Sequence, residues 1–372
     1  MTEQPSQRRE SRRTHFKSRH GCATCKQRRV KCDETRPKCR KCAVGNRMCS
    51  YQNQQPEHPH HDGSATPEPT ARGTFTAMDL SLLHHAECNL ADFIALRVDV
   101  KPIITVAIDN AVTAPYLLDQ LLALSALNRA ASDPAMASVY QQQATELQTR
   151  ALTIFNKAKE DLSEANHLTS FLFATLLGVH VLCDTLANHR HALTAFVSAF
   201  VDYIRLHRGV RAVTNIYWKQ ILQSDLKPLL YIIEWVERAD QLEPGKDTAE
   251  IRGFLESAPG LSPSSLEACL EALKLVQWVV DMTKLEPTRF DLAVHAAMAW
   301  PLMIPDAYID ALYQNRPEAL AILSYYAAIL HRQRDFWVFK DSGSALVKLI
   351  ERHIGPFWRE AIAWPCSQVN KD

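Results

Sequence analysis

The sequence has little glycine and no long uninterrupted apolar run. Glycine makes up only 11 of the 372 residues, below the usual share of about 7%, and turn signals at the regular spacing of short strands are absent. These absences argue against an all-β or collagen-like chain. The chain nevertheless contains 47% apolar and 22% charged residues, which is enough to bury a core, so disorder of the whole chain is also excluded.

The most apolar stretch, residues 170–187, is interrupted by His180 and Asp184. A membrane span would need about 20 predominantly apolar residues. The first residues are rich in arginine and contain no apolar segment of the kind found in signal peptides. We therefore expect no membrane span and no secretory signal, and we expect the cysteines to lie in a reducing compartment.

The net charge of +1 conceals a strong asymmetry along the chain. Residues 8–49 contain fifteen Lys or Arg and three acidic residues, a net charge of +12, whereas the rest of the chain carries −11. One short end is therefore suited to contact a polyanion, and the large remainder is not.

The composition divides the chain into four parts. We predict a basic flexible tail over residues 1–20, suited to nuclear import or phosphate contacts, and a cysteine-rich domain over residues 21–50. Residues 51–73, rich in Pro, Gln and His, are typical of a linker. Residues 74–372 form the fourth part, a large domain.

Apolar residues recur at helical spacing throughout this large domain, as at Leu147, Ala151 and Phe155. Ser262-Pro263 and Arg316-Pro317 are typical helix starts. We predict ten or more helices packed as one all-α domain, with a mobile loop over residues 241–265, where prolines and glycines gather. Arg205, Arg208 and Arg211 are expected on a solvated helix face.

Six of the ten cysteines share one spacing, Cys-x2-Cys-x6-Cys, used twice: Cys22, Cys25, Cys32 and Cys39, Cys42, Cys49. In a reducing compartment this pattern favours zinc over disulfides. Two tetrahedral zinc ions need eight ligand positions, which six thiolates supply only if two of them bridge both metals. The symmetry of the repeat predicts that the first cysteine of each unit, Cys22 and Cys39, is the bridging pair.

The two units differ in charge, and the difference predicts which of them would contact a polyanion such as a nucleic acid. The first unit contains Lys26, Arg28, Arg29 and Lys31, whereas the second contains mainly small, apolar or neutral residues between Cys42 and Cys49. Only the first has the charge for phosphates and the guanidinium groups for guanine O6 and N7.

The pattern from Gly21-Cys22 through Lys26-Gln-Arg-Arg-Val-Lys31-Cys32 to Pro37-Lys38-Cys39, Cys42 and Cys49 resembles the fungal Zn2Cys6 binuclear-cluster transcription factors. The resemblance implies a nuclear protein that binds two Zn2+ and double-stranded DNA, with Cys22 and Cys39 bridging and Pro37 turning the loop between the units. It further implies that Arg28 and Arg29 read a CGG-type triplet. The phosphate contacts that it implies are Lys26, Lys31, Lys38, Arg40 and Lys41.

The helical part, in segments such as residues 121–127, 203–213 and 316–323, resembles the regulatory domain of the sterol uptake control proteins and their relatives in filamentous fungi. That resemblance implies an effector and activation module. Tryptophans and methionines toward the C-terminus, such as Trp278, Met282, Trp300 and Met303, are able to line an apolar cavity for a small lipophilic effector, or simply to fill the core. Residues 50–73 contain no heptads, which leaves open a homodimer through the helical domain or binding to a single half-site.

Three functions are compatible with these features. The leading one is a sequence-specific transcription factor for RNA polymerase II genes of a metabolic or secondary-metabolite pathway. The alternatives are a sterol- or lipid-responsive regulator of sterol genes, and a DNA-bound repressor or scaffold whose helical domain binds proteins. Catalytic motifs are absent from the sequence, so we do not expect an enzyme.

Overall fold

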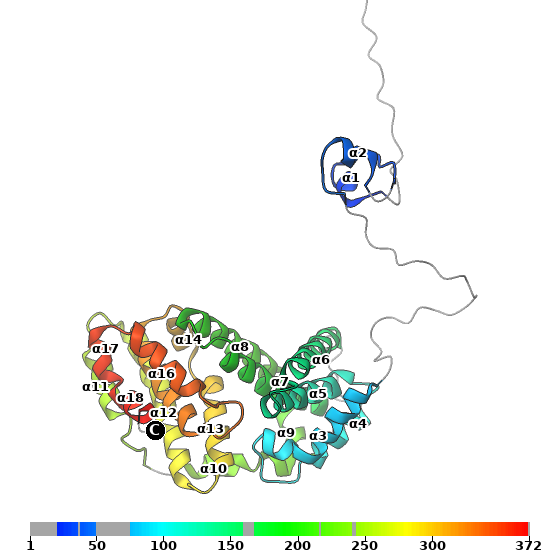
Figure 1. Cartoon of the computed structure of the whole chain (residues 1–372). Helices are drawn as coiled ribbons and strands as arrows, with labels where there is room; N and C mark the ends of the chain where they lie inside the picture. The colour runs from blue at the N-terminus through cyan, green and yellow to red at the C-terminus, as the bar shows by residue number, and fades with distance from the viewer. Residues whose placement is uncertain are drawn as a thin grey trace, which may run out of the picture. The chain divides into compact units, whose positions relative to one another are not determined.

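The computed structural model divides the chain into two compact units, Met1–Thr66 and Pro67–Asp372. Every regular element of the described residues is a helix (Figure 1), which confirms the predicted fold class of a small cysteine-rich domain followed by a large all-α domain. The three boundaries between the four predicted parts remain predictions. The structure describes residues 21–35, 38–49, 75–158, 167–215, 217–239 and 243–370.

The helical unit begins with five helices that pack around one another. α5 lies at their centre and packs against each of the others. Every residue from Tyr116 to Ala126 is buried, including the polar Asp119, Gln120 and Ser125, as expected for a helix that is surrounded by others. The five helices are α3 (Ala77–Phe93), α4 (Lys101–Asp109), α5 (Pro115–Ser132), α6 (Ala137–Ala158) and α7 (His167–Asn188).

A second group of helices forms the C-terminal part of the unit and is centred on α15, in which every residue from Glu318 to His331 is buried. The predicted starts at Ser262 and Arg316 are confirmed as the N-caps of α12 and α15. The group consists of α11 (Ala249–Ser257), α12 (Pro263–Leu285), α13 (Phe290–Met303), α14 (Asp306–Tyr313), α15 (Pro317–Arg332), α16 (Ser342–His353), α17 (Pro356–Ala361) and α18 (Ala363–Val369).

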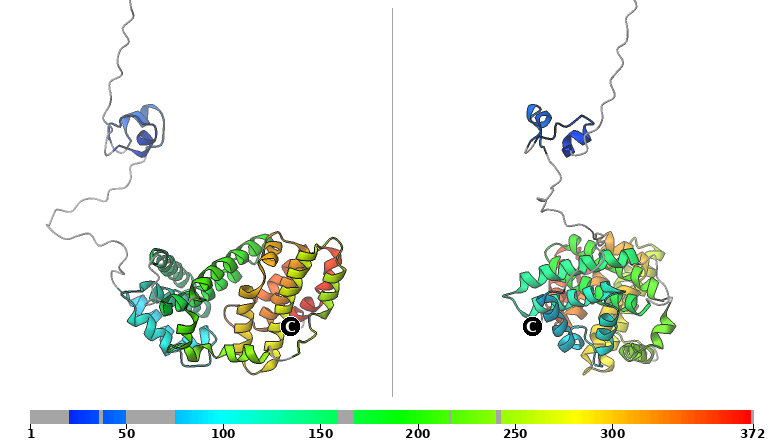
Figure 2. Two further views of the ribbon diagram at one scale, coloured as in Figure 1. Left: turned by 180° about the vertical axis from the view of Figure 1, so that it is seen from behind. Right: turned by 90° about the vertical axis from the view of Figure 1, so that its right-hand side faces the viewer.

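The long helix α8 (Leu193–Asn215) connects the two groups, because it packs on α7 at one end and contacts α13, α14 and α16 of the second group (Figure 2). After α8 the chain returns through α9 (Trp218–Leu222), the 3-10 helix η3 (Lys227–Leu230) and α10 (Ile232–Ala239). The end of α3 also joins the groups: Trp337 Nε1 donates to the Phe93 carbonyl at 2.9 Å, and His295 Nε2 to the Ala95 carbonyl at 3.0 Å.

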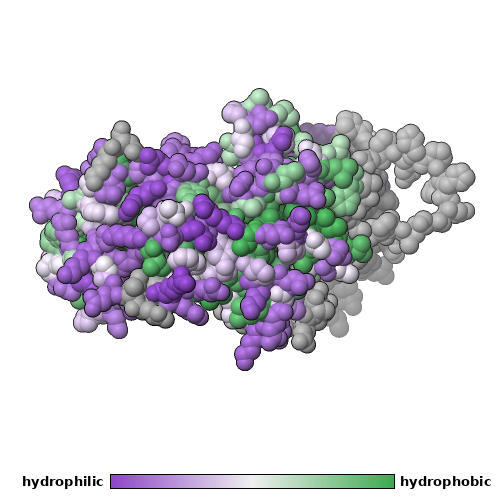
Figure 3. Space-filling model, turned by 90° about the horizontal axis from the view of Figure 1, so that it is seen from below, coloured by the Kyte–Doolittle hydropathy of each residue, from purple (hydrophilic) through white to green (hydrophobic). Residues whose placement is uncertain are grey.

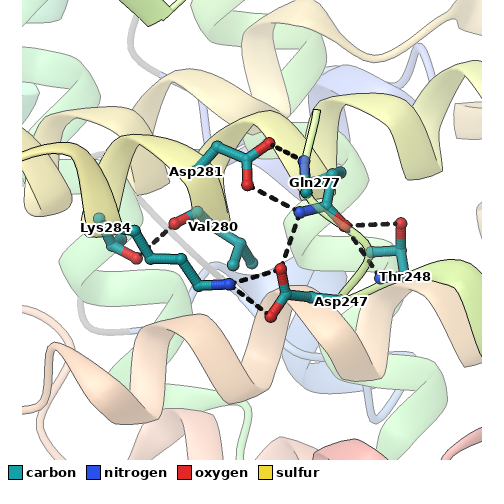
Figure 4. Close-up of polar contacts among 8 residues, drawn as sticks. Asp247, Thr248, Gln277, Val280, Asp281 and Lys284 are labelled. Carbon is teal, nitrogen blue, oxygen red and sulfur yellow. Dashed lines mark hydrogen bonds and ion pairs between the residues drawn. The ribbon is translucent and has the colours of Figure 1, made fainter. Parts of the chain in front are cut away.

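The prediction of a mobile loop over residues 241–265 was wrong for the part that the structure describes. This stretch contains α11, and the turn before it is held by side chains of α12 (Figure 4). The buried side chain of Gln277 accepts hydrogen bonds from the Thr248 N–H and hydroxyl at 2.9 and 3.0 Å. Lys284 Nζ lies 2.6 Å from the Asp247 carboxylate. Contacts with a helix about thirty residues away therefore order a segment that its own composition would leave flexible.

The prediction of a solvated arginine face on α8 is wrong for Arg208 and right for Arg205, whose side chain is 51% exposed. Arg208, whose side chain is only 22% exposed, lies 2.6 Å from Asp306 and donates to the Ile304 carbonyl. Arg205 lies 3.3 Å from Asp310. The two arginines therefore hold α8 against α14. The side chain of Arg211 lies outside the described set.

The aromatic residues that suggested an effector cavity are mostly core residues. Trp300 is fully buried and stacks on Tyr326 with ring centroids 4.3 Å apart, while its Nε1 donates to the Ala272 carbonyl at 3.2 Å. Met282 is fully buried as well, and Trp278 is partly buried against the same core. These contacts favour the core-filling alternative for this part of the domain.

One helix of the described residues, α7, is long and apolar enough to cross a membrane. In this fold 67% of its most apolar window is buried, and it packs between α5 and α8. On the face of the helical unit drawn in Figure 3, hydrophilic side chains predominate and hydrophobic ones form smaller patches among them.

The close crossing of α15 and α16 gives the first prediction. A Cβ added at Gly343 would overlap the Ala327 carbonyl oxygen and the His331 backbone nitrogen. Because these are backbone atoms, we expect Gly343→Ala to lower the free energy of unfolding by about 1–3 kcal/mol. The control is Gly253→Ala in the middle of α11, where an added Cβ meets no atom within 4 Å and should stabilise by up to about 1 kcal/mol. Urea unfolding of the full chain measures both, and equal effects would contradict the packing described.

Candidate zinc cluster and nucleic-acid interface

The six cysteines of the first unit occupy equivalent places around two short helices, α1 (Ala23–Gln27) and α2 (Arg40–Val44). In each half the first cysteine is the N-cap of the helix, the second lies within the helix, and the third follows it in the chain. Five of the six are buried, and Cys49 is partly buried. The described core of this unit consists of these cysteines alone.

The sulfur atoms form two groups of four that share two members. One group contains Cys22, Cys25, Cys32 and Cys39, and the other contains Cys22, Cys39, Cys42 and Cys49; within each, all Sγ atoms lie within 4.8 Å of one another. The shared pair, Cys22 and Cys39, is the pair that the symmetry of the sequence predicts as bridging.

The sulfur spacing fits zinc. The Sγ atoms of Cys22 and Cys39 are 3.7 Å apart, as are those of Cys25 and Cys39, too far for a disulfide. Zinc–sulfur bonds of about 2.3 Å in a regular tetrahedron place the sulfurs about 3.8 Å apart. Burial raises the pKa of the Cys25 thiol to about 12, so its thiolate needs a nearby cation. The six cysteines therefore fit a pair of zinc ions.

Backbone geometry repeats between the two halves. The N–H of Cys22 donates to Cys32 Sγ at 3.4 Å, and the N–H of Cys39 donates to Cys49 Sγ at 3.3 Å. The chain leaves each helix through a residue with positive φ, Arg29 (55°) and Asn46 (45°). In both halves the next N–H then bonds back to the carbonyl of the second cysteine, Val30 to Cys25 at 3.1 Å and Arg47 to Cys42 at 2.9 Å. The repeat in the sequence is thus a repeat in structure.

The side chains differ between the halves although the backbones match. Every basic residue predicted to contact DNA has an exposed side chain: Lys26, Arg28, Arg29 and Lys31 in the first half, and Lys38, Arg40 and Lys41 at the start of the second. The corresponding surface after Cys42 exposes Val44 (85%) and Met48 (90%). The first half therefore carries four basic side chains in and directly after its helix, whereas the second carries its own mainly before and within the first turn of α2, with Arg47 as the one basic residue after Cys42.

Two residues that the sequence analysis missed connect the halves. The Thr24 hydroxyl donates to the Met48 carbonyl at 2.7 Å. Asp33 Oδ2 accepts from the Thr35 hydroxyl at 2.5 Å and from the Arg40 N–H at 3.0 Å. These two donors lower the pKa of Asp33 to about 2. The spacing of metal ligands does not reveal such contacts. The presence of the acidic Asp33 in so basic a segment was a signal in the sequence that this residue has a structural role.

Some predicted features lie outside the described residues. These are Pro37 with its predicted turn, the basic tail over residues 1–20 and the linker over residues 51–73.

Comparison with known proteins agrees with the cysteine geometry. Residues 20–58 match the family model of the fungal Zn(2)-Cys(6) binuclear cluster domain. The chain is 26% identical over 353 residues to the Zn(2)-C6 fungal-type transcription factor afumD of Aspergillus fumigatus, covering 83% of this chain and 84% of the relative. No solved structure matches the chain.

Two further relatives match over much shorter stretches. Sterol uptake control protein 2 of Candida albicans is 58% identical over 40 residues, 11% of this chain and 6% of that protein. The aspercryptin biosynthesis cluster-specific transcription regulator atnN of Emericella nidulans is 61% identical over 33 residues, 9% of this chain and 5% of that protein. Matches of 40 and 33 residues are about as long as the cluster domain alone.

The N-terminal unit is therefore a zinc-cluster domain of the fungal Zn(2)-Cys(6) class, which binds two zinc ions. The resemblance to the zinc-cluster transcription factors that the cysteine pattern indicated is confirmed. In this chain the cluster domain precedes a large all-α domain, and the match to afumD extends through most of that domain.

The shared sulfurs predict how zinc content responds to substitution. The full chain should contain two zinc ions, and a chelator should unfold the cluster domain, because its described residues form no core besides the cysteines. Cys39→Ala, which removes a sulfur common to both groups, should lose both ions, whereas Cys49→Ala should retain one. Cys88→Ser, at an exposed cysteine of α3, is the control and should retain two.

Elemental analysis of the purified chains measures these contents. A single zinc ion in the unmodified chain, or identical zinc content in the Cys39 and Cys49 variants, would contradict the shared-ligand arrangement.

Proposed function

We propose that this protein is a nuclear, sequence-specific DNA-binding regulator of transcription and not an enzyme. The observation that carries the proposal is the group of exposed basic side chains between the second and third cysteines of the first unit, Lys26, Arg28, Arg29 and Lys31, where the second unit has Ala43, Gly45, Asn46 and Met48. The cysteines hold the backbone of both halves in the same way, so folding does not require the difference in charge between the two segments. Contact with a polyanion accounts for it.

In the proposed interface α1 enters the major groove. Arg28 and Arg29 lie where the chain leaves α1, and both are exposed, so their guanidinium groups are available for paired hydrogen bonds to guanine O6 and N7. We propose a CGG-type triplet as the site. Lys26, Lys31, Lys38, Arg40 and Lys41 would contact phosphates, which fix orientation and carry no sequence information.

A further proposal concerns the genes that the protein regulates. We propose a metabolic or secondary-metabolite gene set, supported by the short match to a regulator of a biosynthesis cluster. A homodimer through the helical domain and a small lipophilic effector remain predictions, and the burial of Trp300 and Met282 gives no support to a cavity around these side chains.

Substitution of the proposed reading residues tests the function. Arg28→Ala and Arg29→Ala should each reduce the preference for CGG sites over scrambled sites by about 1–3 kcal/mol, the value of a bidentate arginine–guanine pair. The control is Arg47→Ala, an exposed basic residue of the second half, which should leave the preference unchanged. Fluorescence anisotropy with labelled CGG and scrambled duplexes measures this preference as the ratio of the two affinities. Unchanged preference in both α1 variants would exclude α1 as the reading element.

Substitution of a proposed phosphate contact should act differently. Lys38→Ala or Lys41→Ala should weaken binding to all duplexes alike and reduce the slope of log K against log salt by about 0.9 each. A loss confined to CGG duplexes would show that these lysines read bases instead.

A further inference from the structure

The cluster domain contains an acidic residue that electrostatics alone would disfavour. Residues 21–49 include nine Lys or Arg and two acids, Asp33 and Glu34. A carboxylate on a surface that binds DNA repels phosphates, and each such charge weakens binding. Asp33 lies directly after Cys32 and is exposed, so it is not buried out of reach of the DNA.

The contacts of Asp33 join the two halves of the domain. Its Oδ2 accepts from the Thr35 hydroxyl at 2.5 Å, which fixes the carboxylate against its own loop. The same oxygen accepts from the Arg40 N–H at 3.0 Å. Arg40 is the first residue of α2. A single side chain thus connects the end of the first cysteine unit to the start of the second helix.

This contact supplies something that α2 lacks. The first N–H groups of a helix have no partner within the helix. In α1 the N-cap sulfur of Cys22 accepts from the Cys25 N–H at 3.4 Å, whereas the N-cap Cys39 of α2 makes no side-chain capping bond. Asp33 provides the acceptor from outside α2, and therefore sets the position of its first turn relative to the first half.

We propose that Asp33 is a positioning residue for DNA binding. By holding the first turn of α2, it places the exposed side chains of Lys38, Arg40 and Lys41 so that they contact the same DNA that α1 reads. The inference rests on the proposed function. It assigns to Asp33 no contact with DNA, because Oδ2 accepts from Arg40 and Thr35 and a carboxylate repels phosphates.

The direction in which DNA affinity changes when Asp33 is removed distinguishes a positioning role from a purely electrostatic one. If Asp33 contributes only its charge, its removal strengthens binding. If it positions α2, its removal weakens binding despite the removal of a repulsive charge. The neighbouring Glu34 offers a matched control, because Glu34→Gln removes the same charge and leaves the Asp33 oxygen and both of its donors in place.

The experiment compares the full chain with Asp33→Ala, Asp33→Asn and Glu34→Gln. Zinc content is measured first, and then affinity for CGG and scrambled duplexes over a range of salt. We expect Asp33→Ala to keep two zinc ions, to bind about threefold to tenfold more weakly, and to show a salt slope that is shallower by about 0.9 for each phosphate that the variant no longer neutralises. Its preference for CGG should stay unchanged, because α1 is untouched. Asp33→Asn keeps an acceptor oxygen and should bind at least as tightly as the unmodified chain, as should Glu34→Gln.

Two results would overturn the inference. One is an Asp33→Ala chain that holds two zinc ions and binds as tightly as Glu34→Gln. The other is an Asp33→Asn chain that holds two zinc ions but shows a shallower slope of log K against log salt than the unmodified chain. If Asp33→Ala loses zinc, the Asp33→Asn chain alone tests the inference. An unmodified chain that binds no DNA contradicts the proposed function itself, and the role of Asp33 with it.

Discussion

The sharing of two sulfurs between two metal sites is the constraint on which the cluster domain depends. Among the residues of the domain that the structure describes, the buried hydrophobic core consists of cysteines, so burial of other apolar side chains does not hold the two helices together. Zinc–thiolate bonds take over that role, since the free energy of metal binding acts as folding free energy in domains of this size. Because Cys22 and Cys39 belong to both sulfur groups, neither half can form its complete ligand set without the other.

This arrangement separates folding from recognition. The backbones of the two halves repeat closely, down to the N–H donors that contact the sulfurs and the positive φ of Arg29 and Asn46. The exposed side chains are therefore free to differ, and they do: Arg28 and Lys31 lie where the other half has Gly45 and Met48. In the proposed function the symmetric frame gives rigidity, and the asymmetric surface gives DNA contact.

Features that depend on local pattern could be predicted from the sequence. The cysteine spacing predicts two equivalent units, and the helical spacing of Leu147, Ala151 and Phe155 predicts the buried face that these residues form on α6. The proline-led starts of α12 and α15 are also visible. Features that depend on distant partners were missed: α11 is ordered through Gln277, Arg208 is held by Asp306, and Asp33 meets Arg40. In each case the contact joins separate parts of the chain, and the local pattern does not specify which residues become partners.

The central claim is that the DNA-contacting surface consists of the basic side of the cluster domain. Amide chemical shifts of the isotope-labelled, zinc-loaded chain on addition of a CGG duplex test this most directly. The account predicts that the largest changes fall on residues 26–31 and 38–41, with small changes at residues 43–48. Changes centred on residues 43–48, or confined to the helical domain, would contradict it.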